Sequence, residues 1–143
     1  MMNLLDSTPG FAAVVKRGTL MTPPKSGSIQ GMEDNLKKAV TEMLVLALLS
    51  REDMYAAQIT QALEDRSHAA LSIQFPYSVL YRLISFGYIV EGYKKIAPDG
   101  RRRQYYQITP EGRVHKEELV AFYRQFSGGV ELLLREEGDG SDR

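Results

Sequence analysis

The feature that most constrains this chain is one β-hairpin pattern set among helical sequences. Residues 88 to 108 alternate as strands do, around a Pro-Asp-Gly turn at 98 to 100. Proline fixes φ in such a turn and glycine accepts a left-handed backbone. We expect strands over 88 to 96 and 101 to 108. A lone hairpin is barely stable in water, so the flanking helices must supply its core.

Three stretches before the hairpin have helical spacing. The first begins near Asp34, a candidate N-cap, and continues through LKKAVTEMLVLALLS, which is apolar on well over half its surface. The second runs from about Met54 to Asp65. The third runs from Ser72 to Gly87, a glycine placed to close the helix at positive φ. Its outward-facing residues are Gln74, Ser78, Tyr81, Arg82 and Ser85.

A long helix is predicted after the hairpin. Thr109 caps it, and Pro110 takes the first position, where a missing N–H costs nothing. Gly128 and Gly129 allow a bend or an early end. Apolar residues recur at spacings of three and four at Leu119, Phe122, Phe126, Val130 and Leu133. Such a seam is typical of a helix that packs against a partner helix.

The predicted order α-α-α-β-β-α is the layout of a winged helix-turn-helix. The fold class is therefore mainly α with a two-stranded β wing (α+β), plus a long C-terminal dimerisation helix. We expect four parts: a poorly ordered extension at 1–31, a winged-helix DNA-binding domain at 32–109, a dimerisation helix at 110–135 and an acidic flexible tail at 136–143. Three interpretations of the extension stay open: it is inert, it is an arm that contacts DNA, or it contacts lipid. Met32 is an alternative first residue of the protein.

Composition excludes several classes of function. A chain of 143 residues has no room for separate substrate and cofactor domains. The absence of cysteine removes disulfides and thiolate sites and favours the cytoplasm. No apolar run approaches the roughly 18 residues that span a bilayer. His68 and His115 lack neighbours at metal-ligand spacing, and no phosphate loop or nucleophile elbow occurs. We expect no catalytic residue, metal, cofactor or membrane partner.

Charge is balanced overall but is not evenly distributed. The chain has 18 basic and 18 acidic residues, yet between residues 82 and 103 six basic residues stand against two acidic ones. The basic ones are Arg82, Lys94, Lys95, Arg101, Arg102 and Arg103. Together they could bind phosphates, with Gln74, Tyr77, Ser78 and Tyr81 of the third helix near base edges. The alternatives are a merely solvated hairpin, a Tyr77 that completes the core, and an Arg82 paired with an acid such as Glu64.

Three segments of the chain resemble the PadR-like regulators, within a match from Leu36 to about Leu134. They are LKKAVTEMLVLALLS followed by MYAAQI, then YSVLYRLISFGYI, then DGRRRQYYQITPEG. The family's pattern in the third helix corresponds here to Tyr77, Ser78, Leu80, Arg82, Leu83 and Gly87. Pro76, Gln74 and Ala56 depart from that family's usual residues. The first two departures concern the first turn of the reading helix.

The resemblance implies a homodimeric repressor of the short, single-helix subgroup on a two-fold operator in double-stranded DNA. Its C-terminal helix would be swapped against the partner's first helix. Some members bind flat aromatic or cationic compounds between the paired helices. Phe122, Tyr123 and Phe126 could line such an effector site, or they could simply pack the dimer. The alternative function is a winged-helix module that binds a protein partner and not DNA.

Overall fold

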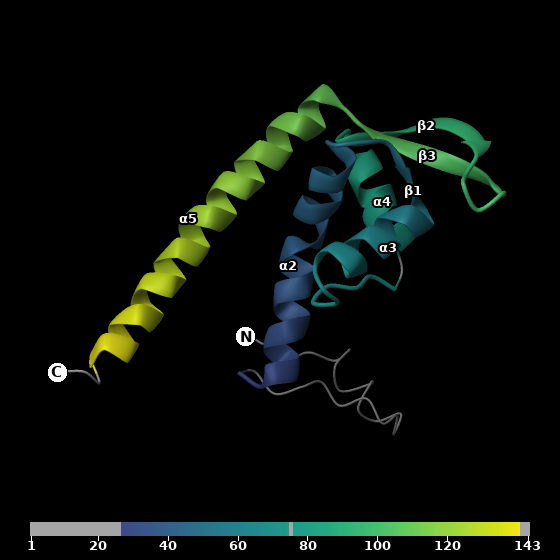
Figure 1. Ribbon diagram of the computed structural model, residues 1–143. Coiled ribbons are helices and arrows are strands. Elements are labelled where there is room, and N and C mark those ends of the chain that lie inside the picture. Colours follow the sequence, from purple (N-terminus) through teal and green to yellow (C-terminus); the bar gives the residue numbers. More distant parts are fainter. Residues whose placement is uncertain (1–26, 75, 141–143) are drawn as a thin grey trace, which may run out of the picture. The chain divides into compact units, whose positions relative to one another are not determined.

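Helices pack against a small antiparallel sheet, and the helices and the two long strands follow the order that the sequence predicts. The computed structural model describes residues 27–74 and 76–140. Their elements are α2 (Ile29–Leu49), β1 (Met54–Tyr55), α3 (Ala56–Arg66), α4 (Pro76–Ser85), β2 (Ile89–Ile96), β3 (Arg102–Ile108) and α5 (Pro110–Gly140) (Figure 1). The chain divides into one unit that ends at Lys38 and a second that begins at Ala39.

Helix α2 begins earlier than predicted, within the first unit. The Gly31 amide donates to Ser28 Oγ at 3.0 Å, so Ser28 is the N-cap. Asp34 lies inside the helix, where it accepts a hydrogen bond from Gln30 Nε2 at 2.8 Å. The prediction of Asp34 as cap is therefore wrong, because Ser28 satisfies the first amides instead. Most of the predicted extension, residues 1–26, lies outside the described residues.

The core of the second unit lies between α2, α3, α4 and the sheet. Both α3 and α4 contact the sheet, the first through β1 and β3 and the second through β2 (Figure 1). The largest fully buried side chains are Val45, Leu46, Leu49, Met54, Ile59, Leu80, Leu83 and Ile89. Tyr106 belongs to the same cluster, and its burial raises its pKa to about 12. All these side chains are apolar or aromatic, so the hydrophobic effect holds the unit together.

The sheet has three strands, in the order β1-β3-β2, where the sequence predicts two. Met54 and Tyr55, predicted as the start of the second helix, pair instead with Tyr106 and Tyr105 of β3. Tyr55 has extended dihedrals as the N-cap of α3, and its amide donates to Gln58 Oε1 at 3.4 Å. A two-residue strand is too short to show alternation, which is why the pattern missed it.

The start of α4 also differs from the prediction. The helix begins at Pro76, not Ser72, and proline suits this position because no partner is needed for its nitrogen. His68 and Ala69 adopt positive φ in the segment before it, which breaks the helical path. The end is as predicted, because Gly87 has φ of 80° directly after the helix.

The hairpin of β2 and β3 closes through the predicted turn. Gly100 has φ of 86°, and the Ala97 amide donates to the Arg101 carbonyl at 2.8 Å. The register pairs Ile96 with Arg102 at the tip, and it shifts between Glu91 and Lys94. The shift is a bulge, which increases local strand twist.

Thr109 joins the hairpin to α5 and to the end of α4. Its amide donates to the Tyr88 carbonyl at 3.0 Å, and its hydroxyl donates to the Gly87 carbonyl at 2.7 Å. The same hydroxyl accepts from the Gly112 amide at 2.9 Å, which caps the helix as predicted. Helix α5 then runs through Gly128 and on to Gly140, beyond the predicted end at residue 135.

The space at Gly112 generates a first prediction. A Cβ at this position would lie 2.1 Å from the Tyr88 carbonyl oxygen, which is backbone and cannot move aside. We expect Gly112→Ala to lower the free energy of unfolding by about 3 kcal/mol in urea titrations at fixed protein concentration. The matched control is Gly128→Ala on the same helix, where nothing lies within 4 Å. That change should raise stability by about 0.5–1 kcal/mol. Equal midpoints for the two variants would contradict the close approach.

Candidate nucleic-acid interface

The outer face of α4 presents a pair of tyrosines to solvent. Tyr77 is 51% exposed and Tyr81 is 59% exposed, and their ring centroids lie 6.1 Å apart. Leu80 and Leu83, on the other side of the helix, are 1% exposed and fix its rotation. Tyr77 therefore does not complete the core. Its ring and hydroxyl are available on the same face as exposed Ser78.

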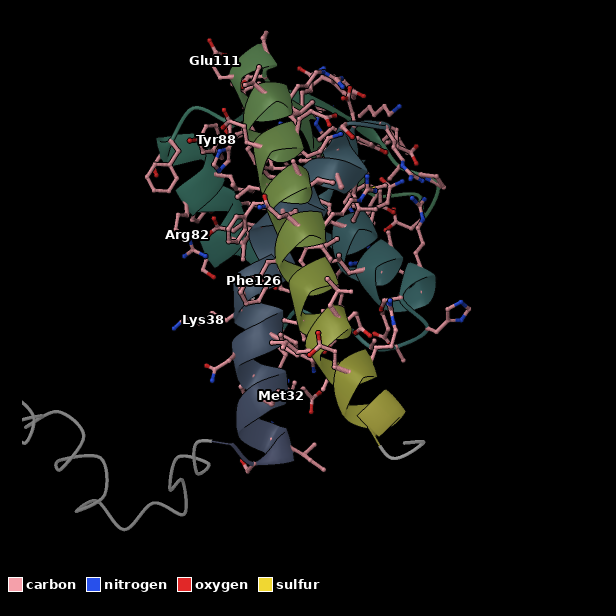
Figure 2. The ribbon with its side chains drawn as sticks, turned by 90° about the vertical axis from the view of Figure 1, so that its left-hand side faces the viewer. Met32, Lys38, Arg82, Tyr88, Glu111 and Phe126 are labelled. Carbon is pink, nitrogen blue, oxygen red and sulfur yellow. The ribbon has the colours of Figure 1, made fainter. Side chains whose placement is uncertain are left out.

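Arg82 lies on α4 as predicted, but its partner is different. Its Nε donates to Glu42 Oε2 of α2, not to Glu64 of α3 (Figure 2). Both side chains remain partly exposed, at 49% and 31%. Spacing along one helix cannot reveal a contact between two helices, so Glu42 could not be predicted as the partner from the sequence. This ion pair engages the Nε donor of Arg82 on its own chain.

Gln74 does not lie on the helix surface where it was predicted. It precedes Pro76, in the segment between α3 and α4, and it is exposed. Its side chain is therefore carried by irregular backbone, separate from the turn that places Tyr77 and Ser78.

The four outer cations of the wing are exposed, and the fifth is neutralised. Lys94, Lys95, Arg101 and Arg102 are all open to solvent. Arg103 Nη2 lies 2.5 Å from Asp99 Oδ2. That hydrogen bond lowers the pKa of the Asp99 carboxyl, as does the bond it accepts from the Arg101 amide. Asp99 thus orders the tip and satisfies one of its three arginines.

A stack of three tyrosines supports the cations at the base of the wing. Tyr105 meets Tyr55 edge-on at 5.4 Å and stacks on Tyr93 at 5.1 Å. Lys95 Nζ lies 4.8 Å from the Tyr105 ring centroid, and the Arg103 guanidinium lies 5.2 Å from that of Tyr55. Rings attract cations through their faces, so the stack orients both charges. This cluster was not predicted from the sequence, although the pairing of Lys95 with Arg103 in the hairpin places neighbouring tyrosines on the same face.

Asp53 anchors the same stack to the turn before β1. The Tyr93 hydroxyl donates to Asp53 Oδ2 at 2.9 Å, and Gln107 Nε2 donates to the same oxygen at 3.0 Å. The first of these bonds raises the pKa of Tyr93. Asp53 is therefore a positioning residue that sequence spacing did not single out.

One hollow brings α4 and the wing together. Its lining comes from α3, α4 and all three strands, namely Tyr55, Ala56, Ala57, Tyr77, Glu91, Lys94, Arg103, Gln104 and Tyr106. Tyr77 from α4 thus shares a surface with Lys94 and Arg103 from the wing. Glu91 adds one negative charge there, which opposes a phosphate in the hollow itself. The cations at the rim of the hollow and at the tip of the wing are still suited to bind a polyanion.

The predicted seam of α5 divides into two parts. Leu119 packs against the core of its own chain. Phe122 and Phe126 are 64% and 61% exposed, and their rings stack at 5.9 Å (Figure 2). Tyr123, Val130 and Leu133 are exposed as well. A shallow apolar groove follows these side chains along the helix.

Among residues 27–74 and 76–140, no three His, Cys, Asp or Glu side chains come together as a metal site. None of the helices over those residues has the length and apolar character to cross a bilayer. His115 stacks on Tyr88 with centroids 4.1 Å apart, and its Nδ1 lies 3.8 Å from Glu118.

Comparison with known proteins matches this architecture. The model of the "Transcriptional regulator PadR-like family" matches residues 45–118. A PadR-like transcriptional regulator from Bacillus cereus is 29% identical with a TM-score of 0.61, over 70% of this chain and 96% of that one. A PadR family transcriptional regulator from Eggerthella lenta is 28% identical with a TM-score of 0.62, over 74% and 91% of the two chains. An uncharacterised protein of Lysinibacillus sphaericus is 27% identical over 95 residues, 65% of this chain and 86% of that protein.

These matches confirm the predicted fold class, to which the structure adds the short strand β1. Family members are transcriptional regulators, which also confirms the expectation that the chain is not an enzyme. Because the family model covers more than half of the sequence, the chain belongs to the PadR-like family of transcriptional regulators.

Proposed function

We propose that this regulator is a sequence-specific DNA-binding repressor that binds a two-fold operator as a homodimer in the cytoplasm. The observation that carries the proposal is the hollow shared by α4 and the wing. There Tyr77 lies on the same surface as Lys94 and Arg103. A helix that reads bases and a hairpin that binds backbone must face one duplex together.

The exposed face of α4 would enter the major groove. Tyr77, Ser78 and Tyr81 offer hydroxyls for hydrogen bonds and ring edges for apolar contact with thymine methyl groups. Arg82 would exchange Glu42 for a phosphate or a guanine edge, since a guanidinium group can donate two hydrogen bonds to the O6 and N7 acceptors of guanine. Gln74 would contact the duplex from the segment before the helix.

The wing would bind the flanking phosphates. Lys94, Lys95, Arg101 and Arg102 carry exposed charge, and the tyrosine stack directs Lys95. Each neutralised phosphate releases counterions, which makes binding depend on salt. Arg103 contributes less until it parts from Asp99.

Dimerisation would use the exposed stripe of α5. Phe122, Phe126, Val130 and Leu133 form an apolar surface too large for a lone helix in water, and a second copy would bury it. A flat aromatic effector in the same groove, beside Tyr123, is the ligand response that we propose for it. A winged-helix module that binds protein and not DNA is the alternative, and the salt dependence below separates the two.

A second prediction concerns the wing. We expect Arg102→Ala to weaken binding to all duplexes and to reduce the slope of log affinity against log salt by about one. Fluorescence anisotropy with operator and random duplexes measures both effects. Arg124→Ala, an exposed arginine on α5, is the control and should leave the slope unchanged. An unaltered slope for Arg102→Ala would remove the wing from the interface, and no binding by the parent chain would favour the protein-binding alternative.

A third prediction concerns the dimer. Phe126→Glu places a charge in the centre of the apolar stripe, where an unpaired buried carboxylate is costly. We expect monomers in sedimentation velocity at concentrations where the parent chain is dimeric. Arg124→Glu changes charge on the opposite side of α5, from helical geometry, and should remain dimeric. A dimer that survives Phe126→Glu places the interface elsewhere.

A further inference from the structure

A second hollow lies between α2, α3 and the segment that follows α3. Its volume is about 340 Å³. Its lining is Leu44, Ala47, Leu48, Arg51, Ala62, Leu63, Arg66, Ser67 and Leu71. None of these residues belongs to the α4 and wing surface, or to the exposed stripe of α5. Pockets of roughly 300–1,000 Å³ commonly hold small molecules.

The lining combines an aliphatic floor with two guanidinium groups. The floor consists of leucine and alanine side chains, and none of the nine lining residues is aromatic. A flat ring would therefore find no face on which to stack, whereas a flexible alkyl chain can follow such a floor. The apolar floor alone would be compatible with many occupants, so the charges decide the ligand class.

The two arginines are available to an anion. Arg66 Nη2 lies 3.8 Å from Glu52 Oε2, and both side chains are about half exposed, so this pair is weak. The Arg51 side chain is exposed, and within the described part of the chain it forms no ion pair or hydrogen bond. Guanidinium groups bind carboxylates in a forked geometry.

We propose that this hollow binds a small aliphatic carboxylate, with the alkyl chain against the leucines and the carboxylate on Arg51 and Arg66. Octanoate represents this ligand class, since its alkyl chain can lie along the leucine and alanine side chains of the floor. An alcohol of the same length would gain the apolar contact alone. The charge on the ligand therefore supplies the selectivity.

The site borders the segment that leads into the reading helix. Ser67 Oγ accepts a hydrogen bond from the Leu71 amide at 2.9 Å, and both residues line the hollow. His68 and Ala69 between them hold positive φ, a costly conformation for residues with a side chain. A ligand that contacts Leu71 would thus act on the path into α4. This coupling rests on the proposed DNA-binding function, whereas occupation of the hollow does not.

Isothermal titration of the full chain with sodium octanoate, without DNA, tests the site. We expect saturable binding at one site per chain, and we expect Arg51→Gln to weaken it about tenfold through loss of a charge-assisted contact. Binding of 1-octanol should be the same for both proteins. Arg124→Gln on α5 is the matched control and should bind octanoate as the parent does.

A second variant tests the floor. Ala47→Leu adds side-chain volume inside the hollow and truncates no buried side chain. It should abolish binding of both octanoate and octanol. Circular dichroism checks that the variant folds. Octanoate that fails to bind, or binds equally to all variants, overturns the proposal. Binding seen only with monomeric Phe126→Glu also overturns it, because a second copy would then cover the hollow.

Coupling is measured separately. If octanoate changes the affinity for the operator, the operator must change the affinity for octanoate by the same factor. If the protein binds octanoate but no DNA, the proposed carboxylate site stands and the proposed DNA-binding function is wrong. If the protein binds DNA but no octanoate, the proposed DNA-binding function stands and the proposed carboxylate site is wrong.

Discussion

The close approach of the α5 backbone to the Tyr88 carbonyl is the constraint on which the arrangement of this protein depends. Three elements meet there: the end of α4 at Gly87, the start of β2, and the first turn of α5 at Gly112. Thr109 satisfies polar groups on all three sides, so none is left unpaired. Helix α4, the hairpin of β2 and β3, and helix α5 thus share one junction, and their relative directions are set within a few residues.

The prediction agrees with the structure where a residue has a distinctive backbone role or where a pattern repeats along one element. Gly87, Gly100 and Thr109 have distinctive backbone roles, and each lies where it was expected. The hairpin follows from alternation over many residues, and the exposed stripe of α5 follows from apolar residues at spacings of three and four. These features depend on residues that lie close together in the sequence, so one sequence is enough to predict them.

The differences arise where contacts between distant segments decide the outcome. Strand β1 exists because Met54 and Tyr55 find partners on β3, about fifty residues later in the chain. Arg82 pairs with Glu42 across forty residues, and Lys95 lies on a tyrosine stack assembled from three strands. No spacing rule within one element reports such pairs. Even the start of α2 depends on one serine whose capping role is visible only with its amide partner.

The pairing of Arg82 with Glu42 has a consequence for how such a protein would search a genome. An arginine that is paired with a carboxylate of its own chain binds nonspecific polyanions less tightly, because each polyanion must compete with that carboxylate. Only a ligand that offers better-aligned acceptors completes the exchange. Loose complexes would then dissociate quickly, which favours rapid sampling of many sites over lingering at wrong ones.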